Sequence, residues 1–159
     1  MKTLGPAETQ RIALLIEAEA IQLREFIDLL GREEAMLVSG DTDGLLSLTN
    51  EKTDRYRQLQ RLHDDRALLL GRHGLPNNEV SIRANCAHLP RVLARWDEVL
   101  DLAGQAKTRN ALNGKLITER MQHNQAALSV LLSAANHPQL YDADGQSRPT
   151  GGGRILGSA

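Results

Sequence analysis

One run of residues constrains the fold of this chain more than any other feature. Between residues 89 and 135, mostly apolar residues recur at alternating steps of four and three. This spacing forms a coiled-coil-like seam along one helix face. A helix from Pro90 to about residue 136 would be about 70 Å long, so we expect an elongated molecule. The seam comprises Leu89, Leu93, Trp96, Leu100, Ala103, Lys107, Asn110, Gly114, Ile117, Met121, Asn124, Leu128, Leu131 and Ala135.

The dipeptide Asn113-Gly114 lies inside this run, although Asn-Gly between apolar segments usually marks a hairpin turn. The seam has the same phase before and after it, whereas a turn would usually reset the phase. We therefore predict that the helix continues through this point. Glycine inside a helix costs about 1 kcal/mol relative to alanine, so some local use should offset Gly114.

Local signals set the limits of the other helices. Pro6 suits a first helical turn, and either Asp41 or Thr42 can serve as the N-cap of a second helix. The short connection makes the first two helices antiparallel neighbours. We predict helices over about 6–38, 42–71, 79–88 and 90–136, the third being short. The apolar stripes are expected at Ile12, Ile16, Ala20, Leu23, Ile27, Leu30 and Leu37, and at Leu45, Leu48, Lys52, Tyr56, Leu59, Leu62 and Leu69.

Composition supports the same fold class. Leucine dominates the apolar residues and aromatic residues make up only 3% of the chain, which suits helix-on-helix packing better than a β-sandwich. We predict an all-α, elongated antiparallel bundle or coiled-coil-like hairpin of about three long helices. Residues 1–137 are expected to form one helical domain. Residues 138–159 carry glycine, proline and serine without helical period and are expected to form a flexible tail.

The sequence shows no catalytic or metal-binding pattern. The five histidines form neither the Glu-x-x-His pattern of di-iron bundles nor the His-Glu-x-x-His pattern of zinc proteases. Glu119 and His123 share a helix face but lack a third ligand. Cys86 is interpreted as a small buried apolar residue. We therefore expect a protein that is not an enzyme and needs no cofactor or metal.

Charge and hydropathy exclude two classes of partner. The net charge is −1, and the basic run from Arg55 to Arg66 is flanked by Asp54, Asp64 and Asp65, which favours a solvated face over a nucleic-acid site. No stretch of 18 apolar residues predicts membrane insertion, and the N-terminus lacks the apolar core of a secretory signal. We expect a cytoplasmic protein.

A protein partner is the remaining class. The second half of the last long helix carries more apolar residues than one narrow face needs: Leu116, Ile117, Met121, Leu128, Val130, Leu131 and Leu132. The inner part of this set can be bundle core, and any part left exposed can bind a client helix. The spacing alone leaves both alternatives open.

Three short blocks of residues give a more specific indication. They are Asn110, Asn113, Gly114, Leu116 and Ile117; then Asn124, Gln125, Ala127 and Leu128; then Leu140, Tyr141, Gly145 and Gln146. In these blocks the chain resembles the FlgN-type flagellar export chaperones, most specifically over residues 96–146. One departure is Asp142, where the family more often has glycine.

The resemblance implies a chaperone of flagellar type III export. Such a protein binds the C-terminal helical segments of hook–filament junction proteins, prevents their premature association and delivers them to the export gate. Tyr141 and Gly145 in the tail are implied contacts with the export apparatus, and the chain alone is expected to be a monomer or weak dimer. The alternative is a structural or adaptor coiled-coil protein that self-associates through the same seam. The resemblance and the seam together predict client binding by Asn110, Asn113, Gly114, Ile117, Met121, Asn124, Leu128 and Leu131.

Overall fold

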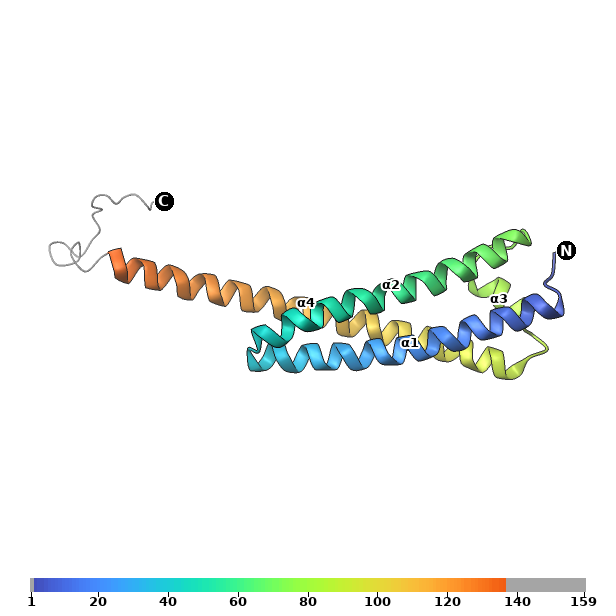
Figure 1. Ribbon diagram of the computed structural model, residues 1–159, viewed down its shortest axis with the longest axis horizontal. Helices are drawn as coiled ribbons and strands as arrows, with labels where there is room; N and C mark the ends of the chain where they lie inside the picture. The colour runs from blue at the N-terminus through green and yellow to red at the C-terminus, as the bar shows by residue number, and fades with distance from the viewer. Residues whose placement is uncertain (1, 137–159) are drawn as a thin grey trace. The chain divides into compact units, whose positions relative to one another are not determined.

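The structure is a computed structural model that describes residues 2–136, with side chains described as far as residue 134 (Figure 1). These residues form four α-helices and no strand, which confirms the predicted all-α class. The chain divides into two compact units, Met1–Leu116 (unit 1) and Ile117–Ala159 (unit 2), and α4 contributes residues to both. The helices are α1 (Pro6–Ser39), α2 (Thr42–Arg72), α3 (Glu79–Asn85) and α4 (Pro90–Asn136).

The helix limits follow from the local signals in the sequence. Pro6 lies in the first turn of α1, and the Asp41 carboxylate caps α2 by accepting a hydrogen bond of 2.9 Å from the backbone N–H of Gly44. Gly40 ends α1 with φ of 78°, a left-handed conformation that glycine adopts without steric cost. The observed ends of α1 and α2 fall one residue beyond the predicted ends.

Two predictions near α4 have different outcomes. The prediction that the helix continues through Asn113-Gly114 is confirmed, since α4 is one helix from Pro90 to Asn136. The predicted end of α3 at residue 88 is wrong, because α3 ends at Asn85. The residue before a proline is disfavoured in helical conformation, so the chain leaves α3 in a turn before Pro90.

The core of unit 1 is built around α1, which runs antiparallel beside α2 as predicted (Figure 1). Six of the seven predicted apolar positions of α1 are buried, and Ile27 is partly buried. Residues from α2, α3 and the first half of α4 complete the core. Its buried members are Ile12, Ile16, Ala20, Leu23, Phe26, Leu30, Leu70, Ile82, Cys86, Trp96, Val99 and Ala106.

The predicted stripe of α2 needs correction at its centre and end. Tyr56 is 61% exposed, while Arg66 and Leu70, which the stripe omitted, are buried. Both lie in phase with Leu59 at helical spacing, so the helix geometry places them inward.

The predicted α4 seam is confirmed at Trp96, which is buried, and at Leu93, which is partly buried against the core, but it is wrong over the rest of unit 1. Beyond Trp96, the buried residues of α4 are Val99, Ala106 and Asn113, at steps of seven. The prediction instead placed Leu100, Ala103, Lys107, Asn110 and Gly114 on the seam, and all five are exposed. One residue corresponds to a rotation of roughly 100° about a helix axis, and the observed phase leaves the Lys107 ammonium in solvent.

Candidate partner-binding surface

The described side chains of α4 beyond unit 1, residues 117–134, are all exposed. Their large apolar members are between 37% and 67% exposed, which is unusual for so many neighbours on one helix. They are Ile117, Met121, Leu128, Val130, Leu131 and Leu132. Within unit 2, residues 117–136 form a single stretch of helix, so this stretch alone contains no second element that could cover them.

Five residues of this segment share one helix face. They follow one another at steps of four, three, four and three, and we call them the exposed stripe: Ile117, Met121, Asn124, Leu128 and Leu131. An apolar stripe at this spacing is the surface that a partner helix buries in a coiled-coil-like contact. The stripe carries five of the eight residues that the sequence predicted for client binding.

The other three predicted residues lie in unit 1 and differ among themselves. Asn110 and Gly114 are exposed, and a Cβ added at Gly114 would meet no atom within 4 Å. Asn113 is only 2% exposed. Its side-chain amide donates hydrogen bonds to the backbone carbonyl of Leu30 (2.9 Å) and to Oε1 of Glu33 (2.8 Å). The structure therefore gives Asn113 a packing role in the chain as it stands.

Asn113 belongs to a polar cluster that joins three helices. The Lys52 ammonium, on α2, donates to both carboxylate oxygens of Glu33, on α1, at 3.0 and 3.1 Å, and Asn113 adds the contact from α4. Glu33 is 5% exposed, so its charge is paired and hydrogen-bonded, as a buried carboxylate requires. We call Glu33, Lys52 and Asn113 the Asn113 cluster.

A second buried cluster surrounds Arg66 at the other end of unit 1. The guanidinium donates two hydrogen bonds to the Glu19 carboxylate, at 2.9 and 3.0 Å, and a third to Oδ1 of Asn77 at 2.7 Å. Its central carbon lies 4.8 Å from the centre of the Trp96 ring, which is cation–π distance. Sequence reasoning missed this cluster because it placed Arg66 on a solvated basic face. The available signal was that Glu19 and Arg66 each fall in phase with the apolar residues of their own helix.

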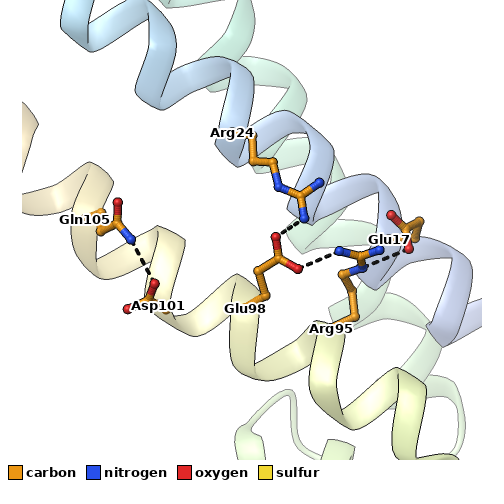
Figure 2. Close-up of polar contacts among 6 residues, drawn as sticks. All are labelled: Glu17, Arg24, Arg95, Glu98, Asp101 and Gln105. Atoms are coloured by element: carbon orange, nitrogen blue, oxygen red, sulfur yellow. Dashed lines mark hydrogen bonds and ion pairs between the residues drawn. The ribbon is translucent and has the colours of Figure 1, made fainter.

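Ion pairs at the edge of unit 1 attach the first half of α4 to α1 (Figure 2). Nε of Arg95 donates to Glu17 at 2.9 Å and its Nη1 to Glu98 at 2.5 Å, while Arg24 also pairs with Glu98. Figure 2 also shows Gln105 donating to Asp101 within α4, at 2.8 Å. Partly exposed pairs of this kind contribute little energy each, and their effect here is to orient the two helices.

Four side chains of unit 1, among them Glu51 and Cys86, have pKa values displaced by their surroundings. The hydrogen bond from Arg32 holds the pKa of the Glu51 carboxyl below its usual range, with the Arg32 charge acting in the same direction. Burial raises the pKa of the Cys86 thiol. Cys86 is fully buried and has no disulfide, which confirms its interpretation as a small core residue.

The described residues lack the features of a metal site or a membrane-spanning helix. Residues 2–136 contain no group of three or more His, Cys, Asp or Glu side chains that could hold a metal ion. Over the same part of the chain, no helix has an apolar stretch long enough to cross a bilayer. The predicted tail contacts, Tyr141 and Gly145, and the rest of the predicted flexible tail over 138–159 lie outside the described residues.

The fold and the exposed stripe define an all-α protein that presents an apolar helix face to solvent. Comparison with known proteins identifies the family. The chain belongs to the FlgN family, because the family described as FlgN protein matches residues 1–149.

Several curated relatives carry the name "Flagella synthesis protein FlgN". One from Yersinia enterocolitica serotype O:8 is 25% identical over 150 residues, covering 93% of this chain and 95% of that protein. Another from Yersinia enterocolitica is 27% identical and covers 80% of this chain and 81% of its own length. The protein from Escherichia coli K12 is 25% identical and covers 91% and 97%. No solved structure matches this chain. Membership of the family supports a role in flagellum synthesis.

Proposed function

We propose that this protein is a cytoplasmic chaperone of flagellar type III export. Its family supports the flagellar role, and the observation that carries the finer proposal is the exposed stripe on α4. Apolar side chains at heptad spacing on a solvated helix are stabilised when a second apolar helix covers them.

The proposed clients are the C-terminal helical segments of the hook–filament junction proteins. Helices that pair only after assembly expose their apolar faces beforehand, and the exposed stripe supplies a matching face. Covering a client segment would prevent premature association until the complex reaches the export gate. Asn124 is the one amide within the stripe, and a polar residue at a seam position favours one register of the bound helix at some cost in affinity.

This proposal assigns binding and no catalysis to the protein. A chaperone of this kind works by covering and releasing an apolar helix, which requires neither ATP nor a metal ion in the chain itself. We propose accordingly that the protein is not an enzyme and is a monomer or weak dimer without its client.

Co-purification with a tagged client tests the proposal. The tag is placed on the C-terminal segment of each hook–filament junction protein, and this chain is supplied as wild type, as Leu128→Asp or as Leu46→Asp. Leu46 is the matched control, because it is an exposed leucine of α2 outside the stripe. We expect a defined complex with the wild type and with Leu46→Asp and none with Leu128→Asp. Absence of any complex, or equal recovery of all three forms, would contradict the proposal.

The same stripe also fits an alternative, a structural or adaptor protein that self-associates. Static light scattering on the purified chain separates the two functions. The chaperone is expected to remain a monomer or weak dimer until client is added. A tight oligomer that does not respond to client would favour the adaptor.

A further inference from the structure

A hollow of about 300 Å³ lies in unit 1, between the start of α1 and the end of α2. It is separate from the exposed stripe in sequence and in composition. We call it the basic hollow, and its lining residues are Ala7, Glu8, Arg11, Leu69, Arg72 and His73.

The arginines of the basic hollow differ from most others in unit 1. Seven arginines of the unit form ion pairs with carboxylates: Arg24, Arg32, Arg55, Arg57, Arg66, Arg83 and Arg95. Arg11 and Arg72 are exposed and have no such pair among the described residues. Lys2 adds a further cation, because its side chain lies against Gly74, next to His73.

One acid lines the hollow, and its position leaves the arginines uncompensated. The Glu8 carboxylate folds back toward Gly5 at the start of its own helix, where a negative charge is favourable, and it forms no ion pair with Arg11 or Arg72. The basic hollow therefore has an excess of positive charge.

Helix stability explains only one of the two arginines. Arg72 lies in the last turn of α2, where a cation interacts favourably with the helix dipole. Arg11 lies in the second turn of α1, beyond the first turn within which the helix dipole acts, so its charge does not stabilise the helix in this way. Its exposed guanidinium is available to a negatively charged group from outside the chain.

We propose that the basic hollow docks an acidic segment of a protein partner. A Glu or Asp carboxylate of the segment accepts hydrogen bonds from Arg11 and Arg72, because guanidinium groups form paired hydrogen bonds with carboxylates more readily than lysine does. Leu69 and Ala7 offer apolar contact to the neighbouring residue of the same segment. The volume suits one or two side chains, so the contact is local and its affinity depends on salt.

Fluorescence anisotropy on the full chain tests this proposal. The probe is a labelled octapeptide with the sequence Ala-Glu-Leu-Glu-Glu-Leu-Glu-Ala, and its twin carries glutamine in place of every glutamate. The test variant is Arg11→Gln with Arg72→Gln. The control is Arg61→Gln with Arg91→Gln, which removes two exposed arginines that also lack an ion pair among the described residues and lie outside the hollow.

The expected result is that the acidic probe binds and its glutamine twin does not. The test variant should weaken binding at least about tenfold while the control stays within about twofold, because only the first removes the docking charges. Circular dichroism should show both variants folded, since all four side chains are exposed. The proposal is overturned if the probe fails to bind at millimolar concentration or if both variants weaken it equally. It is also overturned if inorganic phosphate or phosphatidylglycerol vesicles, rather than the peptide, bind in an Arg11- and Arg72-dependent manner.

Discussion

The two parts of α4 have similar apolar spacing and opposite burial. In unit 1 the helix buries Trp96, Val99, Ala106 and Asn113, whereas every described side chain over residues 117–134 is exposed. Where α4 is covered, α1 supplies the contacts through Glu17, Leu30 and Glu33. Helical spacing thus indicates which residues share a face, but only the neighbouring helices decide whether that face becomes core.

Matched aspartate substitutions should separate the two parts most strongly. Val99→Asp places a carboxylate in the core, where Val99 is 3% exposed, and we expect it to lower the free energy of unfolding by about 4 kcal/mol or to prevent folding. Leu128→Asp should change the free energy of unfolding by less than about 0.5 kcal/mol, because Leu128 is 56% exposed. Urea denaturation followed by circular dichroism measures both. A similar loss in both variants would show that Leu128 belongs to a core.

The Arg66 cluster tests how unit 1 is held together. Arg66→Leu leaves the Glu19 carboxylate buried without its partner, so we expect the free energy of unfolding to fall by about 3 kcal/mol. The double variant Glu19→Leu with Arg66→Leu should recover most of that loss, since it removes both charges. Arg61→Leu, on the exposed face of α2, is the control and should have little effect. If Arg66→Leu has the same urea midpoint of unfolding as the wild type, the buried pair makes no net contribution to the free energy of unfolding.

Two asparagines three residues apart on α4 sharpen the comparison. Asn113→Leu removes two hydrogen bonds from the Asn113 cluster and should lower the free energy of unfolding by about 2 kcal/mol. Asn110→Leu changes an exposed position and should alter it by less than about 0.5 kcal/mol. Thermal and urea unfolding provide the measurement. If Asn113→Leu keeps full stability and loses client binding instead, Asn113 serves the client directly.

Two glycines of α4 give the smallest expected effect. A Cβ at either Gly104 or Gly114 meets open space, so replacement by alanine should stabilise the helix by about 0.5–1 kcal/mol in each case. We expect only Gly114→Ala to weaken client binding, because Gly114 is among the residues predicted to bind the client and Gly104 is not. Calorimetric titration with the client segment, alongside urea unfolding, compares the pair. Equal client affinity for both variants would leave Gly114 without a binding role.

The sequence predicted the helices well because their signals are local. Prolines at positions 6 and 90, the Asp41 cap and the uninterrupted phase through Asn113-Gly114 all act within a few residues. The phase of the seam in unit 1 was harder to predict, since Leu100 and Val99 are both apolar and either can face α1. Lys107 and Gly114 at seam positions were the sequence signal against the predicted phase.

The buried polar clusters could not be predicted from spacing alone. Glu19 and Arg66 are 47 positions apart, and Glu33 and Asn113 are 80 apart, so their pairing depends on how the helices pack. The five residues of the exposed stripe were predicted to share one helix face, because that follows from their spacing alone. Whether these five residues belong to a core or to the surface could not be predicted, because that depends on which other helices pack against them.

Hydrogen–deuterium exchange of the full chain, with and without the C-terminal segment of a hook–filament junction protein, tests the central claim most directly. Backbone amides over residues 117–134 should exchange quickly in the chain alone, because this helix has no buried side chains to stabilise it. Adding the segment should slow their exchange at least about tenfold and leave residues 90–113 unchanged. Unchanged exchange over 117–134 on formation of a complex would contradict the account, because the client would then bind elsewhere.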